Sequence, residues 1–264
     1  RYRKLVRHPQ LQAAIIERIK HGWSPEQIAG RLAYERSSVR VCHETIYRRI
    51  RRDRVKGGHL WLYTRIMSKF ARKRYRSVDH RGVMPGKRHI SERPREVEAR
   101  QRIGHWEGDT VIGADKHHCV LTLVERKTGM AIVKKLTSRS MAEVNEAAMA
   151  AISEHRQCFK TITFDNGTEF ARHYDLNAIG IDTYFCDPHA PWQKGGIENA
   201  IGRMRRFLPR KTDLASLDEH HFTQLIAAYN ATPRKCLDWR TPAEAFSQHL
   251  LHFKRESTSL LSQG

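Results

Sequence analysis

Three strand-like segments followed by alternating helices and strands dominate the sequence from Gly104 onward. The runs HWEGDTVIG, CVLTLVERKTG and AIVKKLTS are strand-like and are separated by turn residues, which is typical of an antiparallel meander. The strand-like runs KTITFD and IDTYFCD then alternate with helical patterns. A chain with this order buries its apolar side chains as a mixed sheet covered by helices. The sequence therefore predicts an α/β core with a mixed five-stranded sheet over residues 104–250, followed by a short tail at 251–264.

Two acids occupy notable places in this predicted sheet. Asp109 lies in its first strand, and Asp165 ends its fourth strand directly before Asn166 and Gly167. Asp-Asn-Gly alone is ordinary turn chemistry, because Asx side chains bond nearby backbone and Gly accepts a positive φ. Strands one and four of such a sheet can be neighbours, however. We therefore expect the carboxylates of Asp109 and Asp165 to lie side by side.

A third acid, Glu198, lies one turn into the predicted helix GGIENAIGRMRRFL. Apolar residues recur along this helix at spacings of four, three and four, so this stripe faces the sheet. Glu198 is one residue round from the stripe and can lean over the end of the sheet. Three converging carboxylates repel one another unless a cation neutralises them. Oxygen ligands with open positions for water and phosphate suit Mg²⁺, with Mn²⁺ as an alternative.

The charge of the chain is concentrated in its first part. The whole chain has 48 Lys and Arg against 28 Asp and Glu, a net charge of +20. Residues 1–104 hold 28 basic and 9 acidic side chains, whereas residues 105–264 hold 20 and 19. A basic surplus in one segment indicates binding of a polyanion, because each neutralised phosphate releases condensed counterions. The sequence lacks an amphipathic basic helix with large apolar anchors, so a membrane surface is the less favoured partner.

The first part of the sequence predicts three short helices. HPQLQAAIIERIKHG has helical spacing, and SPEQIAGRL begins with a capping box formed by Ser24 and Gln27. The third, HETIYRRIRRD, places arginines around an apolar face. This order is that of a helix-turn-helix fold, whose last helix enters the major groove of DNA, although other small helical bundles share it. We expect residues 1–60 to be a DNA-binding helix-turn-helix region that uses Arg48, Arg49, Arg51 and Arg52.

Residues 61–103 are expected to form a basic linker or arm, because periodicity is lost and Arg, Lys, Gly and Pro accumulate. The five cysteines are widely separated and include no C-x-x-C pair, which indicates reduced thiols. His117 and His118 are adjacent on a predicted strand, so they point to opposite faces and disfavour a metal site. No apolar run is long enough for a membrane span or a signal peptide. We expect a cytoplasmic protein.

The ordered motifs GHWEGD, TFDNGTEF, DPHAPWQKGGIENAIGRMRRFLP and YNATPRKCLDWRTPAEAF resemble the DDE transposases of bacterial insertion sequences, specifically the insertion-sequence-thirty family. The resemblance extends upstream through WSPEQIAGRL and HETIYRRI and covers nearly the whole chain. It implies a ribonuclease-H-like catalytic core in which Asp109, Asp165 and Glu198 bind the metal. It also implies a homodimer or larger assembly on double-stranded DNA. Family members usually carry a further helix-turn-helix region upstream, so we expect a shortened protein or a fragment.

The function that this resemblance implies is metal-dependent cleavage at the ends of an insertion sequence, followed by transfer of the freed 3′-hydroxyl into target DNA. Arg205, two turns along the helix from Glu198, is the expected phosphate contact near the metal. Two alternatives remain at this stage. One is a ribonuclease-H-type nuclease or retroviral-like integrase, although no zinc-binding His/Cys set precedes the core. The other is a DNA-binding regulator whose catalytic core is inert.

Overall fold

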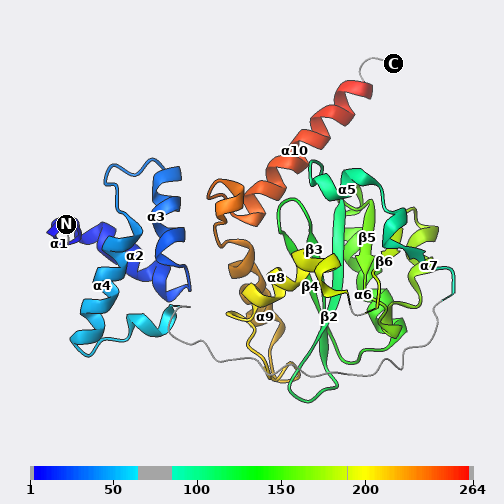
Figure 1. Ribbon diagram of the computed structural model, residues 1–264, viewed down its shortest axis with the longest axis horizontal. Coiled ribbons are helices and arrows are strands. Elements are labelled where there is room, and N and C mark those ends of the chain that lie inside the picture. Colours follow the sequence, from blue (N-terminus) through cyan, green and yellow to red (C-terminus); the bar gives the residue numbers. More distant parts are fainter. Residues whose placement is uncertain (1–2, 65–84, 189, 262–264) are drawn as a thin grey trace. The chain divides into compact units, whose positions relative to one another are not determined.

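The computed structural model describes residues 3–64, 85–188 and 190–261, and these separate into two compact units (Figure 1). The helical unit comprises Arg1–Val78 and Thr232–Thr241. The sheet unit comprises Asp79–Ala231 and Pro242–Gly264. A later segment of the chain is therefore part of the N-terminal helical unit.

The helical unit forms as its sequence patterns predict. It contains α1 (Arg3–Arg7), α2 (Pro9–Lys20), α3 (Pro25–Tyr34), α4 (His43–Val55) and the 3₁₀ helix η1 (Leu60–Tyr63). The predicted capping box at the start of α3 is present, since Ser24 and Gln27 bond each other's backbone N–H groups. One apolar core, which includes Ile15, Ile28 and Ile46, joins the helices.

Residues 232–241 pack against α3 within the helical unit. The Nε2 of Gln27 donates to the carbonyl of Pro233 at 2.9 Å, and Arg31 donates to the carbonyl of Trp239 at 3.2 Å. The indole of Trp239 lies so close to Gly30 that a Cβ on that glycine would come within 2.2 Å of the ring. The helical unit is thus completed by the motif TPRKCLDWRT, which the sequence patterns alone assign to the end of the catalytic core.

The sheet unit contains one mixed sheet with the strand order β1-β6-β5-β2-β3-β4. The antiparallel meander is confirmed, because β2 pairs with β3 and β3 with β4. Strands β2 and β5 pair in parallel, as expected of strands one and four. The strands are β1 (Arg88–His89), β2 (His105–Ile112), β3 (Cys119–Glu125), β4 (Ala131–Leu136), β5 (Thr161–Phe164) and β6 (Asp182–Phe185).

Helices cover both faces of the sheet (Figure 1). On one face α6 packs through Val144 and Ala148 into a core that includes Trp106 and Leu121. On the other face α8 and α9 pack on Val120 and its neighbours. The remaining elements are η3 (Ile90–Glu92), α5 (Arg95–Ala99), α6 (Met141–Glu154), η4 (Arg156–Cys158), η5 (Thr168–Phe170), α7 (His173–Ala178), η6 (Pro191–Lys194), α8 (Gly195–Met204), α9 (Glu219–Asn230), η7 (Lys235–Leu237) and α10 (Pro242–Leu261).

The structure differs from the sequence expectations in two ways. The sheet has six strands instead of five, and folded elements extend beyond both ends of the expected core, residues 104–250. Of the expected linker 61–103, residues 65–84 lie outside the described residues, but residues 85–103 fold onto the sheet. The two-residue strand β1 is too short to produce a periodic signal, and it is held by Arg88, which donates to Asp182 at 2.8 Å. At the other end, α10 continues past residue 250 because neither Gly nor Pro interrupts residues 251–261.

Gly108, between Glu107 and Asp109 on β2, allows the sheet to close against the ring of Phe164. A Cβ at this position would lie 2.3 Å from Cε1 of Phe164, which is itself 1% exposed. We predict that Gly108→Ala lowers the free energy of unfolding by about 1–3 kcal/mol through overpacking. Urea denaturation measures this effect. Gly202→Ala is the matched control, because its Cβ would meet nothing within 4 Å and Ala favours a helix interior; equal losses in both variants would contradict the steric account.

Candidate functional site

The parallel pairing of β2 with β5 brings two predicted site residues together. The register of the two strands aligns Glu107 with Thr163, and continuing it by two residues places Asp109 opposite Asp165. Asp165 follows the last residue of β5, where the chain turns away from the sheet. The expectation that these two acids lie side by side at the sheet edge agrees with this pairing.

The two aspartates use their carboxylate oxygens in the same way. The Oδ1 of Asp109 accepts from the backbone N–H of Thr110 at 2.9 Å, and the Oδ1 of Asp165 accepts from that of Gly167 at 3.0 Å. Each Oδ2 lies 3.8 Å from the Nζ of Lys194. One oxygen of each acid therefore fixes the local backbone, while the other faces a shared positive charge. Asp165 therefore stabilises its own turn through Oδ1 and faces the ammonium group of Lys194 through Oδ2.

Lys194 is the last residue of η6, immediately before α8. Its ammonium group is the positive charge that the two aspartates face. The side chain is 7% exposed, and Nζ also donates to the carbonyl of Gly108 at 3.3 Å. Three oxygens, two from carboxylates and one from a carbonyl, thus surround one positive charge. Because Mg²⁺ and related hard cations take oxygen ligands, this donor set fits a divalent metal ion.

Burial controls the electrostatics of the acid pair. It raises the pKa of Asp109 to about 6, while the ammonium of Lys194 lowers this pKa and the neighbouring carboxylate of Asp165 raises it. An acid with such a pKa holds its proton more readily than an ordinary aspartate. A nearby cation therefore stabilises the pair most when both carboxylates are ionised.

The third predicted ligand is placed differently. Glu198 lies in the first turn of α8 with an exposed side chain. Among the described residues, no group of three His, Cys, Asp or Glu side chains is gathered closely enough to hold a metal ion. The structure therefore brings Asp109 and Asp165 together around Lys194 but does not bring Glu198 into the same cluster.

Glu107, two residues before Asp109 on β2, is a buried acid with a structural role. It is 1% exposed. Its Oε1 accepts from Nη1 of Arg126 at 2.5 Å, and its Oε2 accepts from the backbone N–H of Ile197 at 2.6 Å. The carboxylate thus satisfies an N–H in the first turn of α8 that has no partner within the helix. Glu107 attaches the helix that carries Glu198 to the strand that carries Asp109.

The residues around Glu107 form a buried ionic network that joins α5 to the sheet. Arg126 also donates to Glu98 at 3.1 Å and to the carbonyl of Val97 at 3.2 Å. Arg93 pairs with the other oxygen of Glu98 and donates to Thr163 at 2.9 Å. Burial, reinforced by the neighbouring Arg126, lowers the pKa of Arg93 to about 10. This network explains why part of the expected linker is folded.

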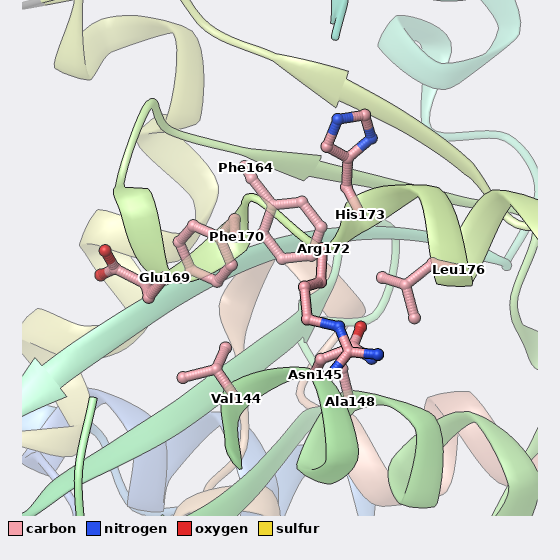
Figure 2. A pocket seen from close by; sticks show the side chains of 9 residues that line it. All are labelled: Val144, Asn145, Ala148, Phe164, Glu169, Phe170, Arg172, His173 and Leu176. Atoms are coloured by element: carbon pink, nitrogen blue, oxygen red, sulfur yellow. The ribbon is translucent and has the colours of Figure 1, made fainter. Parts of the chain in front are cut away.

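Glu169 lies on the face of the sheet opposite to Glu107, at a pocket between α6 and the η5–α7 segment (Figure 2). It is 6% exposed and accepts from the hydroxyl of Thr110 at 2.7 Å. This hydrogen bond joins η5 to the residue after Asp109. Apart from Glu169, Asn145, Arg172 and His173, the residues lining the pocket are apolar.

The predicted DNA-contacting arginines are distributed over both units. On α4, Arg48 and Arg51 are exposed and share Glu44 at 3.4 and 3.5 Å, and Arg52 is also exposed. Arg49 is half-buried and pairs with Asp53 at 3.3 Å. In the sheet unit, Arg205 caps the end of α8, where its Nη1 donates to the carbonyl of Pro209 at 3.5 Å.

Two tryptophans of the sheet unit differ in their surroundings. Trp106 is a core residue, because it is fully buried and stacks on Phe159 with ring centroids 4.3 Å apart. Trp192 is 76% exposed. His118 pairs with Asp115, not with Cys119. No helix in the described part of the chain is long and apolar enough to cross a membrane.

Sequence reasoning missed Lys194. Its sequence signal is modest: it is the only Lys or Arg between residues 183 and 202, and it stands four positions before Glu198. Lys194 comes close to Asp109 and Asp165 only when η6 and α8 pack on the sheet, so its spacing from Glu198 in the sequence does not reveal this contact.

Comparison with known proteins gives consistent matches. Residues 99–191 match the integrase core domain. The chain is 36% identical to the transposase for insertion sequence element IS4351 of Bacteroides fragilis, over 94% of this chain and 76% of that protein. It is 35% identical to the transposase InsI for insertion sequence element IS30A of Escherichia coli K12, over 89% of this chain and 63% of that protein.

Solved structures give weaker matches than these relatives do. The catalytic core domain of BIV integrase is 18% identical, with a TM-score of 0.46, over 57% of this chain and 97% of that one. The HTLV-2 integrase catalytic core domain in complex with magnesium is 19% identical, with a TM-score of 0.43, over 54% of this chain and 95% of that one. Together with the integrase core match, the six-stranded mixed sheet bears out the ribonuclease-H-like expectation.

We predict that Glu107→Gln lowers the free energy of unfolding by roughly 2–4 kcal/mol, because it leaves the buried Arg126 charge without its closest partner. It should also speed hydrogen exchange at the Ile197 amide, measured by mass spectrometry. Glu154→Gln is the matched control, since the exposed ion pair between Glu154 and Lys134 should be worth less than about 1 kcal/mol. Comparable losses in the two variants would refute the proposed role of Glu107.

Asp109 should make stability depend on pH in the metal-free protein. Its folded pKa of about 6 exceeds its ordinary value of 3.8, so its contribution is fully present below 3.8 and is lost as the pH rises through about 6. Asp109→Asn should therefore stabilise the protein by up to about 3 kcal/mol near neutral pH, and less on acidification. Urea denaturation in EDTA across this range measures the difference, and a gain that does not vary with pH would contradict it.

Proposed function

The chain belongs to the transposases of bacterial insertion sequences, within the IS30 family, and on that premise we propose that it cuts DNA at the ends of an insertion sequence and joins them to target DNA. The observation that carries the proposal is the pair of aspartates, Asp109 and Asp165, which face one shared cation from neighbouring parallel strands. The integrase core match supports the same class of polynucleotidyl transfer.

In this proposal Asp109 and Asp165 hold the metal ion through their Oδ2 atoms, and Glu198 is the third ligand. When bound, Mg²⁺ or Mn²⁺ supplies the positive charge that activates the attacking oxygen and stabilises the leaving oxygen. The backbone N–H groups of Thr110 and Gly167 keep the two aspartates oriented by holding their Oδ1 atoms. Glu107 keeps the start of α8 against β2, which limits how far Glu198 can lie from the pair.

The proposed chemistry has two displacement steps. In the first, water attacks the phosphorus at the element end, the bond to the 3′ oxygen breaks, and that oxygen leaves as a hydroxyl. In the second, this 3′-hydroxyl attacks a phosphorus of target DNA and displaces another 3′ oxygen. Each step exchanges one phosphorus–oxygen bond for another, so no nucleotide cofactor and no covalent bond to the protein are needed.

The helical unit would hold double-stranded DNA, with α4 in the major groove. Its exposed residues Arg48, Arg51 and Arg52 are suited to phosphate, because the surface ion pairs from Arg48 and Arg51 to Glu44 are weak enough to exchange. Arg49 is the least available of the four, and Arg205 is proposed as a contact beside the acid site. Joining two element ends requires both to be held at once, so we propose a homodimer or larger assembly on DNA.

A DNA-binding regulator with an inert core is the second candidate. It is favoured by one observation: the described acids gather only Asp109 and Asp165, and Glu198 lies outside their cluster. The chain also spans 76% and 63% of the two relatives described above, so the activity of a whole transposase is a proposal for this chain.

We predict metal-dependent cleavage and joining of a labelled duplex that carries the ends of the source element. Products should form with MgCl₂ or MnCl₂, be absent with EDTA, and fall at least about a hundredfold in Asp165→Asn and Glu198→Gln, because each variant loses a carboxylate that holds the metal ion. DNA binding, measured by fluorescence anisotropy, should persist in both variants.

Glu154→Gln serves as the control, because this exposed acid of α6 pairs with Lys134 and is not among the proposed ligands. DNA binding without cleavage in either metal would support the regulator. Normal cleavage by Asp165→Asn would overturn the assignment of the acids.

A further inference from the structure

Lys194 carries a nearly buried ammonium group, and its partners among the described residues lie at the proposed catalytic site. Its side chain is 7% exposed. Its contacts are the carboxylates of Asp109 and Asp165, both at 3.8 Å, and the carbonyl oxygen of Gly108 at 3.3 Å. A buried cation needs compensating negative charge close by, and these two acids provide it.

The same oxygens cannot serve Lys194 and a divalent metal ion at once. A metal bound by the two Oδ2 atoms would bring at least two further positive charges next to Nζ in a poorly solvated place. Repulsion at such a distance is strong where water screens it little. The ammonium group and the metal therefore compete for one position.

We propose that Lys194 occupies the metal position in the metal-free protein and that metal binding requires its ammonium group to leave. This inference rests on the proposed metal-dependent function and adds a step that precedes it. In the metal-free state, the ammonium group of Lys194 offsets part of the negative charge of the two aspartates and keeps them close together. When the metal ion replaces the ammonium group, the positive charge between the aspartates becomes larger while the two carboxylates keep their positions.

The surroundings of Lys194 permit such a movement. Gly195 and Gly196 follow it, and a Cβ on Gly195 would meet nothing within 4 Å. The neighbouring Trp192, two residues earlier, is 76% exposed. By contrast, Ile197 is fixed to Glu107 through its backbone N–H. The segment that can move is thus short and ends where the helix becomes attached to the sheet.

The position of Glu198 fits the same exchange. It follows Lys194 by four residues, just beyond the point where Ile197 is anchored. While the ammonium group of Lys194 occupies the position between the aspartates, Glu198 has no cation to bind there. A divalent ion takes six or more oxygen ligands, so its arrival gives Glu198 a role as a ligand, which fits an exposed Glu198 in the metal-free state.

Chemical labelling of the unmodified protein provides the first test. Lysines are acetylated with an N-hydroxysuccinimide ester in EDTA, in MgCl₂ and in MnCl₂, and the modified fractions are measured by peptide mass spectrometry. Labelling of Lys194 should rise at least severalfold with either metal. Lys134, an exposed lysine paired with Glu154, is the internal reference and should not change. Labelling of Lys194 that is the same with and without bound metal would overturn the exchange.

Metal affinity provides the second test, by isothermal titration calorimetry with MnCl₂ and no DNA. Lys194→Met removes the competing charge and keeps a similar apolar stem, so Mn²⁺ should bind about tenfold more tightly or better. Lys134→Met is the matched control and should bind as the unmodified protein does. Asp109→Asn should abolish binding at this position.

The outcomes separate the exchange from the proposed function. Equal or weaker Mn²⁺ binding by Lys194→Met, with binding still lost in Asp109→Asn, would overturn the exchange and leave the metal site in place. Absence of binding in both the unmodified protein and Lys194→Met would remove the metal site and the exchange together. Circular dichroism of each variant checks that it is folded, and the labelling experiment does not depend on any variant.

Discussion

The buried carboxylate of Glu107 is the contact on which the arrangement of the sheet unit depends. It lies on β2 and receives hydrogen bonds from Arg126, after β3, and from the backbone of Ile197 in α8. Through Arg126 it is connected to Glu98 of α5. Removing a charge of this kind from water is costly, and the cost is offset only when each oxygen has a well-placed partner. The elements that supply those partners are thereby fixed relative to β2.

Two residues further along β2, the same geometry gives Asp109 its chemical setting. It points to the face on which α8 packs, while Thr110 turns to the other face and meets Glu169. Backbone N–H groups hold one oxygen of Asp109 and one of Asp165, so the other two remain directed at a common cation. Pairing of β2 with β5, local turn bonds and the placement of η6 thus combine to form a cation site from groups that are distant in the sequence.

The helical unit shows a different kind of dependence. Its three predicted helices form around their own apolar core, yet residues 232–241, far along the chain, also belong to it. Gly30 leaves the space that Trp239 fills, and backbone groups of Pro233 and Trp239 accept from Gln27 and Arg31. The helical unit, which carries the exposed arginines of α4, is therefore built from two segments that lie far apart in the sequence.

Much of the fold is predictable from local patterns. Strand-like runs separated by turn residues predicted the meander, and the capping box at Ser24 predicted the start of α3, because these signals arise from neighbouring residues. The pairing of strands one and four was also predictable, since few arrangements bury such a sheet. By contrast, the strand β1 and the folded segment 85–103 carry no periodicity, because they are held by ionic contacts with distant residues.

The sequence by itself determined which residues are chemically suited to bind a metal, since Asp109 and Asp165 stand at the strand positions that bring carboxylates to one edge. Only the tertiary structure decided that Glu107 is a buried anchor and that Lys194 faces both aspartates. The spacing of residues in the sequence predicts which way neighbouring side chains point, but it does not predict which distant charge will be buried beside them. That choice is made when the helices pack on the sheet and each buried charge must find a partner.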